Sequence, residues 1–425
     1  MTAGLQGLSP ARLALTLWLP FSLAYFVSFW LRNVNAVLAP LLTEEFSLTG
    51  ADLGLLTSAY SLTFALVQLP GGLLLDRFGA RRVNAVLLLA GVTGLVVMAM
   101  SPTFVGVTLG RALAGLGVSM CLMAAIKAFS QWLPAQRLPL ALSLLLTMGG
   151  LGGLVATAPV GWALGFVSWR WLFGFAAVVL LAIAAMLLLL VPERRRDESA
   201  RPESLAQLVA GLGSVFGYWP FWRLNLPVMV LAGTYQAFLS VWIGPWMQDV
   251  GGYSRADAVL MVAWVALATT VGFALYGFIV NALVARGWEP LRLFKWHMGC
   301  SIGSFALITM GGATASHIWM LYFVIGTGGA VYVTMVTRMF PQHLNGRANT
   351  ASNMLSFGST FALQWGIGAA LDLFPAAAGG HAAIGYQRVC EVLLAVSVLL
   401  FVALVLPLRH LRSWSEAPSA DGRKV

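Results

Sequence analysis

Apolar runs of about 20 residues follow one another along almost the whole chain, and short polar turns separate them. A helix of that length crosses the roughly 30 Å hydrocarbon core of a bilayer and satisfies its own backbone polar groups there. We therefore predict an all-α polytopic membrane protein with twelve transmembrane helices. In the first half of the chain, the predicted spans are 13–42, 51–75, 83–102, 103–129, 137–163 and 169–191. In the second half, they are 223–248, 255–284, 292–314, 316–340, 347–374 and 385–408.

The longest polar stretch, PERRRDESARPESLAQ (192–207), lies between the two sets of spans. Its charge and proline content are typical of a connector. The predicted organisation is a six-helix bundle over 1–191, a cytoplasmic connector over 192–222, and a second six-helix bundle with a short tail over 223–425.

The two bundles repeat each other in near-constant register. Pro40, Asp52 and Gly72 align with Pro245, Asp257 and Gly277, and a second register aligns Gly115 with Gly326 and Lys127 with Arg338. Thr49-x-x-Asp52 and Ser254-x-x-Asp257 also coincide, and each is typical of a capping pair at a helix start. The repeat predicts two pseudo-symmetric halves related by an axis along the membrane normal.

The charge distribution sets the orientation. The chain is 59% hydrophobic and 9% charged, with a net charge of +10. If both termini are cytoplasmic, most of the 25 basic residues lie on the cytoplasmic side, whereas the opposite loops are acidic. This asymmetry predicts a multi-pass protein of the inner membrane, and it makes the positive charge a topology signal, not a nucleic-acid footprint. The apolar run before Arg32 is too long for a signal-peptide core, so we interpret it as the first span.

The loop between the second and third predicted spans reads GGLLLDRFGARR (71–82). Gly71 and Gly72 are expected to permit close helix contact, and Gly79 to permit a sharp reversal. Asp76 and Arg77 would lie at a helix end beside the lipid headgroups, and Arg81 with Arg82 would anchor the loop on the cytoplasmic face.

This spacing resembles the loop signature of the major facilitator superfamily, G-x-x-x-D-[RK]-x-G-[RK]-[RK]. The positions that match are Gly72, Asp76, Arg77, Gly79, Arg81 and Arg82, with Ala80 displaced into one position. The resemblance implies the fold of that superfamily, transport by alternating access, and a role for Asp76 in latching the two halves together. In the second half Asn281 replaces the aspartate, so a second latch is not expected.

The fourth predicted span contains LGRALAGLG (109–117), similar to the R-x-x-x-G element of the same family at Arg111 and Gly115. The fifth, MGGLGGLVATAPVGW (148–162), is rich in glycine but lacks the G-x-x-x-G-P spacing of drug/proton antiporters. Antiport by analogy is therefore not supported.

Arg32 and Arg111 lie at matched depths in the first and fourth predicted spans, and the first half has no acid within a span to pair with them. An arginine facing lipid costs roughly 2.5 kcal/mol or more, so both are expected to face a wet interior. A guanidinium suits a carboxylate or phosphate, which makes an anionic substrate the natural counter-charge. The alternatives are snorkelling of Arg32 to the interface and hydrogen bonding of Arg111 to backbone carbonyls.

Arg32 followed by Pro40 also resembles the first helix of two subfamilies, the organophosphate/phosphate antiporters and the anion:cation symporters of organic acids. In both, the arginine contacts the anionic substrate, and this implies the same role for Arg32. The antiporters use a second arginine before a matching proline, but here Ala237 precedes Pro245. A carboxylate or another singly charged anion is therefore favoured over a doubly charged phosphate.

Further candidates for substrate contact are polar or aromatic residues within predicted spans, and each has interhelical hydrogen bonding or packing as its alternative role. They are Asn35, Tyr60, Gln68, Tyr235, Gln236, Tyr322, Gln364 and Trp365. Asn35, Tyr235 and Gln364 are the preferred choices.

The leading hypothesis is a monomeric secondary transporter that moves a small organic anion by alternating access in symport with protons, for which Glu391 is a weak carrier. One alternative is copper import through Met335 and Met339 near His343, because thioethers select Cu(I). Another is a non-transporting sensor on the same fold. We expect no enzyme activity, cofactor or resident metal, and we expect Cys121, Cys300 and Cys390 to be buried, inert thiols.

Overall fold

The computed structural model describes residues 14–406, apart from 134–136, 193–204, 329–331, 333–334, 337–338 and 375–380. In the first half, the helices are η1 (Ala14–Trp18), α2 (Leu19–Asn33), α3 (Asn35–Phe46), α4 (Gly50–Phe78), α5 (Ala80–Met100), α6 (Phe104–Val118), α7 (Cys121–Trp132), α8 (Leu138–Val155), α9 (Ala158–Ala163) and α10 (Trp169–Leu190). In the second half, they are α11 (Leu205–Phe216), α12 (Trp219–Ala237), η2 (Phe238–Trp242), α13 (Ile243–Asp249), α14 (Arg255–Ala285), α15 (Pro290–Gly311), η3 (Gly312–Ala315), α16 (Ile318–Gly326), α18 (Gln342–Leu371) and α19 (Ala383–Val405).

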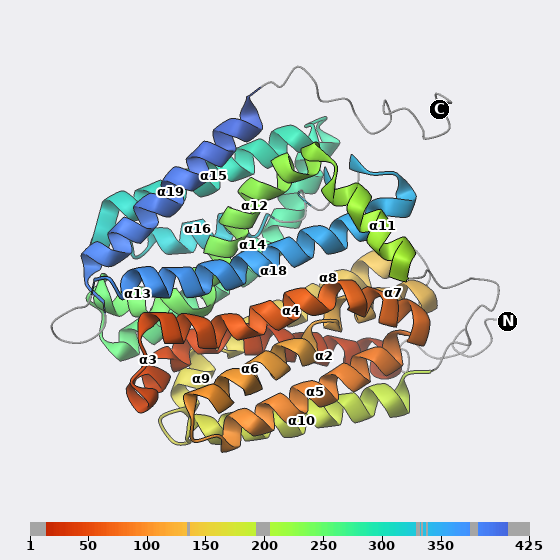
Figure 1. The fold of residues 1–425 in the computed structure, drawn as a ribbon, viewed down its shortest axis with the longest axis horizontal. Coiled ribbons are helices and arrows are strands. Elements are labelled where there is room, and N and C mark those ends of the chain that lie inside the picture. Colours follow the sequence, from red (N-terminus) through yellow and green to blue (C-terminus); the bar gives the residue numbers. More distant parts are fainter. Residues whose placement is uncertain are drawn as a thin grey trace.

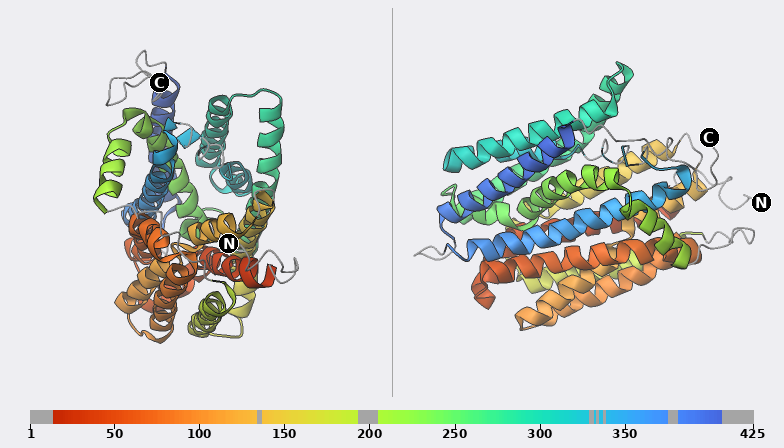
Figure 2. Two further views of the ribbon diagram at one scale, coloured as in Figure 1. Left: turned by 90° about the vertical axis from the view of Figure 1, so that its right-hand side faces the viewer. Right: turned by 45° about the horizontal axis from the view of Figure 1, so that its top comes forward.

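The helices form a polytopic bundle in two layers, with the first half below and the second half above in Figure 1. Among the described residues, ten helices are long and apolar enough to cross a membrane. Two predicted spans fall outside that set. Span 316–340 is described only in part, as α16 and a few residues after it, and span 347–374 corresponds to α18, which is more polar than the others. The polarity of α18 fits its position, because it lies between protein helices (Figures 1 and 2).

Several predicted spans are interrupted, which the apolar pattern did not reveal. Val34 separates α2 from α3, Ser119 and Met120 separate α6 from α7, and Ala156 and Thr157 separate α8 from α9. Between α12 and α13 the chain forms a short π-helix, η2. Such breaks leave the hydrophobic pattern intact, since only the local backbone hydrogen bonds change, and short π-helices are frequent at functional sites.

The connector range 192–222 contains a helix, α11. Its Leu212 and Val215 are buried in a cluster with second-half residues such as Phe221. Residues 193–204 of the connector, which include the arginine cluster, lie outside the described part of the chain.

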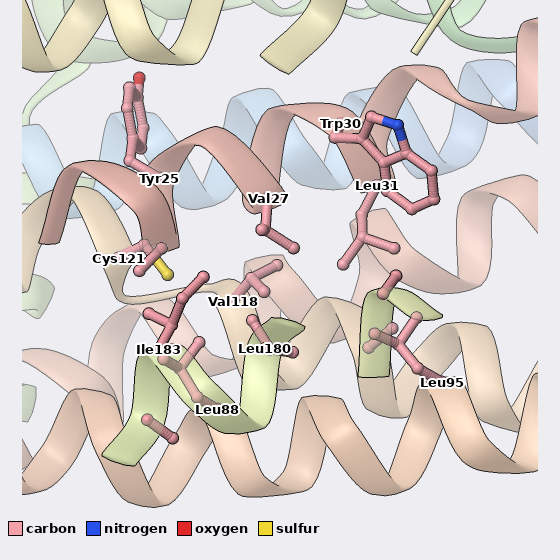
Figure 3. Packing of buried hydrophobic residues seen from close by; sticks show 14 of the residues in the cluster. Tyr25, Val27, Trp30, Leu31, Leu88, Leu95, Val118, Cys121, Leu180 and Ile183 are labelled. Carbon is pink, nitrogen blue, oxygen red and sulfur yellow. The ribbon is translucent and has the colours of Figure 1, made fainter. Parts of the chain in front are cut away.

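The first half has a contiguous apolar core centred on α2 (Figure 3). Val27 and Leu31 on α2 point toward side chains from α5, the α6–α7 break and α10, and Trp30 packs in the same cluster, whereas Tyr25 points away from them (Figure 3). These partners are Leu88, Leu95, Val118, Cys121, Leu180 and Ile183. Small residues allow the surrounding helices to approach: a Cβ built on Gly117 would lie only 2.3 Å from the Cα of Gly91.

The halves meet along α4 and α18, which lie side by side in Figure 1 and again in Figure 2. The two helices touch through backbone where α4 begins and α18 ends, because a Cβ on Gly368 would lie 2.0 Å from the carbonyl oxygen of Gly50. Farther along, the rings of Phe64 and Phe357 stack with their centroids 4.0 Å apart. We call this contact the α4–α18 seam.

The two expected capping pairs are present. Thr49 and Asp52 form a reciprocal capping box at the start of α4. The Ser254 hydroxyl accepts from the Asp257 amide at 3.2 Å and donates to its carboxylate at 2.7 Å. Both acids therefore cap helices and do not enter the bundle.

The loop glycines divide between two roles. Gly79 has φ of +82°, the left-handed region that favours glycine, so the predicted reversal is confirmed. A Cβ built on Gly71 would lie 2.4 Å from the Met120 sulfur, so the two residues are in close contact. A Cβ built on Gly72 would have nothing within 4 Å. The expected close helix contact is thus correct for Gly71 and wrong for Gly72 in this conformation.

Substituting Gly117 by alanine should lower the melting temperature of the purified protein, because the added methyl would collide with the α5 backbone at Gly91. Overpacking of this kind typically costs about 1–3 kcal/mol. Gly174→Ala on α10 is the matched control, since nothing lies within 4 Å of a Cβ there, and it should be neutral or slightly stabilising. Equal melting temperatures for the two variants would contradict the packing argument.

Candidate functional site

Arg32 lines a cavity of about 110 Å³ between the two halves. The first half contributes α2 and the α8–α9 region, and the second half contributes α12, η2 and α14. The lining is mainly apolar, and its polar members are Arg32, Asn33, Thr157, Tyr235, Gln236, Thr269 and Thr270. None of the lining residues is acidic, so the guanidinium is the one formal charge on this wall.

The Arg32 guanidinium is held among aromatic rings. Its Cζ lies 4.6 Å from the ring centre of Phe29, 5.2 Å from that of Phe64, and 4.8 Å from that of Phe357. The ring faces attract a cation, but they offer no lone pair to its N–H groups. The Nε atom is buried without a hydrogen-bond partner, and none of the described ion pairs involves Arg32. Arg32 therefore faces the cavity as a cation with unfilled hydrogen-bonding capacity.

The second half supplies neutral polar groups to the same cavity. The Tyr235 hydroxyl and the Gln236 amide nitrogen are buried without a hydrogen-bond partner, although Thr269 lies close to Tyr235. Thr270 is satisfied, since its hydroxyl donates to the Ala266 carbonyl at 2.8 Å. Unpartnered buried donors are costly, so a ligand that accepts from them would recover that cost.

Arg111 is completely buried within the first half and does not line this cavity. All three guanidinium nitrogens lack a hydrogen-bond partner, and Cζ lies 5.3 Å from the ring centre of Tyr60. The Tyr60 hydroxyl donates to the Ser28 carbonyl at 3.1 Å. Substrate contact by Arg111 and Tyr60 thus stays a prediction.

Asn35 is fully buried at the start of α3. Its amide nitrogen donates to the Thr57 hydroxyl at 3.0 Å, and its Oδ1 atom has no partner. The side chain therefore forms a hydrogen bond between α3 and α4, which is the alternative role expected for these candidates from the sequence.

Gln364 is a buried junction between three helices. Its Oε1 accepts from the Ser61 hydroxyl at 3.1 Å, and its Nε2 donates to the Ser240 hydroxyl at 2.6 Å. The backbone carbonyl accepts from the Trp242 indole at 3.1 Å. Both ends of the amide thus have a partner, whereas the neighbouring Trp365 side chain is 46% exposed on the surface of α18.

Two other candidates have clear packing roles. Tyr322 is buried in an aromatic cluster, with its ring centre 5.7 Å from that of Trp319 and 6.3 Å from that of Tyr235. Gln68 accepts from Asn353 across the α4–α18 seam at 2.9 Å. Neither lines the cavity at Arg32.

Sequence reasoning missed the three phenylalanines around Arg32, although they decide its surroundings. Phe29 stands one helical turn before Arg32 and could have been inferred from that spacing. Phe64 and Phe357 come from α4 and α18, and nothing in a sequence so rich in phenylalanine marks these two.

The described contacts of Asp76, Arg77 and Arg81 in the signature loop lie inside the first half. Asp76 pairs with Lys127, whose ammonium also donates to the Leu75 carbonyl at 2.8 Å. Arg81 donates to the Leu188 carbonyl, and the Arg77 guanidinium lies 5.3 Å from the ring centre of Phe78. Arg82 lies in the first turn of α5 beside Arg81. The latch role of these residues, including Gly72 and Gly79, stays a prediction.

The residues behind the other hypotheses are also placed. Met335 and Met339 pack against the apolar cluster around Phe340, and Arg338 between them lies outside the described residues. Glu391 pairs with Arg388 at 2.8 Å within its own helix. Cys121 and Cys390 are buried as expected, but Cys300 is exposed on α15, so the prediction for that thiol was wrong.

The family model described as "Major Facilitator Superfamily" matches residues 21–364. The chain belongs to the major facilitator superfamily. It is therefore a multi-pass secondary transporter and not an enzyme, and the all-helical fold with two six-helix bundles is that of the superfamily.

Several relatives are similar in sequence. "Probable sulfoacetate transporter SauU" of Cupriavidus necator is 31% identical over 166 residues, a match that spans 36% of this chain and 39% of that protein. "Hexuronate transporter" of Escherichia coli is 22% identical over 366 residues, 80% of this chain and 84% of that protein. "Galacturonate transporter" of Dickeya chrysanthemi is 24% identical and spans 66% of this chain and 83% of that protein.

Solved structures support the same fold. The crystal structure of a D-xylose-proton symporter has a TM-score of 0.71 at 16% identity, covering 91% of this chain and 96% of that one. The nucleoside transporter NupG has a TM-score of 0.72 at 15% identity, covering 93% and 98%.

Gln364→Leu should lower the melting temperature of the purified protein, because it leaves the buried Ser61 hydroxyl without its acceptor and removes the donor to the Ser240 hydroxyl, which keeps only its own bond to the Gln236 carbonyl. An unsatisfied buried polar group costs about 1–3 kcal/mol. Trp365→Leu, at the adjacent and exposed position, is the control and should melt near the wild-type temperature. If the melting temperature of Gln364→Leu were the same as that of Trp365→Leu, the Gln364 hydrogen bonds would not contribute to stability.

Proposed function

We propose that this protein moves a small organic anion across the cytoplasmic membrane by alternating access, in symport with protons. The observation that carries the proposal is the Arg32 guanidinium, which faces a cavity without an acidic lining residue and has a buried Nε atom without a partner. The two halves enclose this cavity, as alternating access requires of a substrate site.

The charge argument favours an anion of the carboxylate type. An uncompensated arginine in a membrane interior costs several kcal/mol, roughly 2.5 or more. The aromatic rings around Arg32 offset part of that cost, and a bound carboxylate would offset the rest through charge-assisted hydrogen bonds. A substrate that neutralises the site in this way is bound more tightly than a neutral compound of the same shape.

The second half favours a singly charged group with further oxygen atoms. Ala237 is fully buried at the position that repeats the first-half arginine, so the described cavity offers one guanidinium. Tyr235 and Gln236 add a hydroxyl and an amide N–H without partners. We assign anion recognition to Arg32 and hydrogen bonding to the rest of the substrate to Tyr235 and Gln236, with Asn33 as a further polar neighbour.

The names of the relatives support this substrate class. Hexuronate, galacturonate and sulfoacetate, for which three of them are named, are all organic anions. Because these anions differ in size, we infer from them only the class of substrate, an organic anion, and not a particular compound.

The coupling and orientation complete the proposal. Import of an anion against a negative interior costs about 2.3 kcal/mol per charge for each 100 mV, and co-transported protons would supply that energy. Glu391 is a poor carrier because it is paired with Arg388 on α19. We further propose a monomer in the inner membrane with both termini cytoplasmic, since the basic residues then follow the positive-inside rule.

The anion site is tested by binding of glucuronate, galacturonate and sulfoacetate to the purified protein, with glucose as the neutral control. At least one anion should bind, and Arg32→Gln should weaken that binding by tenfold or more, as expected for loss of charge-assisted hydrogen bonds (about 1.5–3 kcal/mol). Arg170→Gln is the matched charge control, because Arg170 pairs with Glu45 away from the cavity. Unchanged affinity in Arg32→Gln, or no anion bound by the wild type, would refute the site.

Proton coupling is tested separately by uptake of the bound anion into proteoliposomes with an acidic outside. Accumulation should follow the imposed pH gradient and collapse when a protonophore is added. Accumulation that is the same with and without the gradient would exclude proton symport and leave the anion site intact.

A further inference from the structure

Asp372 binds the start of a helix that belongs to the other half of the protein. It stands directly after α18, and its two carboxylate oxygens accept from the backbone amides of Gly50 at 2.6 Å and Ala51 at 2.8 Å. These are the first two amides of α4, which have no partner within their own helix. The carboxylate is favoured there by both hydrogen bonding and the positive end of the helix dipole.

The backbone of the two helices closes tightly next to this contact. A Cβ on Gly368 would lie 2.0 Å from the Gly50 carbonyl oxygen, and a Cβ on Gly54 would lie 2.5 Å from the Gln364 carbonyl oxygen. This end of the α4–α18 seam is opposite the Asp76 loop and lies at the left of Figure 1. In the proposed orientation it faces the outside of the cell.

Asp372 is held in position from its own half. The Nε2 atom of His381 lies 3.3 Å from the Asp372 carboxylate. The His381 backbone amide donates to Asp249 at 3.3 Å, and the Tyr386 hydroxyl donates to the same carboxylate at 3.0 Å. The acid is thus tied to α13 and α19, so its bonds to α4 connect the body of one half to the body of the other.

Three further hydrogen bonds described across the halves join neutral groups. They run from Ser61 to Gln364, from Asn353 to Gln68, and from Thr270 to the Gly150 carbonyl. Charge-assisted bonds are roughly twice as strong as neutral ones, so the Asp372 contact is the strongest of this set.

We propose that Asp372 is the gating residue of the outer end: its carboxylate holds that end closed, and the cavity opens outward when it leaves the α4 N-terminus. The contact can break and re-form because few backbone amides lose their partner when the carboxylate leaves. The capping box satisfies the Asp52 and Thr49 amides from within the first half, so water need replace the Asp372 carboxylate only at Gly50 and Ala51. The proposal rests on alternating access and not on the identity of the substrate.

The test measures the separation of the halves by pulsed electron spin resonance in lipid nanodiscs without substrate. Spin labels are attached at Phe166→Cys in the first half and Met310→Cys in the second, two side chains that are 75% and 84% exposed near the outer end. Cys121, Cys300 and Cys390 are first replaced by alanine or serine.

Asp372→Asn should raise the population with the longer label distance about tenfold, because the neutral amide loses the charge and one acceptor oxygen. Glu391→Gln removes the same charge from the second half, but Glu391 binds only Gln387 and Arg388 of its own helix in the described contacts. It should leave the distances unchanged.

Ala51→Pro removes one donor from the α4 side without altering any charge, and proline is tolerated in a first helical turn. It should open the outer end in the same direction, and it decides the question if Asp372→Asn does not fold. Wild-type distances in the folded variants, or an equal shift in Glu391→Gln, would overturn the proposal. Because no substrate is present, failure of the anion hypothesis would leave this readout unaffected.

Discussion

A permanently charged guanidinium, partly buried between apolar helices and without a carboxylate beside it, is the constraint on which the site depends. The cost of placing Arg32 there is met in part by three ring faces, one from its own helix and two from the α4–α18 seam. Two of the rings therefore come from helices that form the contact between the halves. The charge is stabilised only where the halves come together, so the ligand site and the interface are parts of one arrangement.

The interface itself is built from small residues and a few polar pairs. Glycines let the backbones of α4 and α18 touch at one end, stacked phenylalanines fill the middle, and an amide pair between Gln68 and Asn353 follows. Polar contacts of this kind suit a contact that must part and re-form, because each lost hydrogen bond is replaced by one to water. The polarity of α18 is thereby explained by its place between the halves and not by exposure.

The spans, the capping boxes and the Gly79 turn could be predicted because each is local: period, neighbouring residues or one backbone angle decides it. Arg32 could be singled out because a lone charge is conspicuous in an apolar run. The partners of Gln364 and the rings around Arg32 could not, since they depend on which helix faces lie together across hundreds of residues. The interruptions at Val34 and Thr157 were missed for a related reason, because a break in backbone hydrogen bonding does not disturb the hydrophobic period.

The glycine contacts along α4 and α18 have a consequence for speed. Where two helices meet through backbone, no side chain has to withdraw from a pocket or change rotamer as the surfaces part. At that end of the seam, the barrier to separation is set by the few hydrogen bonds that cross it, whereas farther along the stacked Phe64 and Phe357 rings must also part. A transporter built in this way can seal that end tightly and still open it without any side-chain rearrangement there.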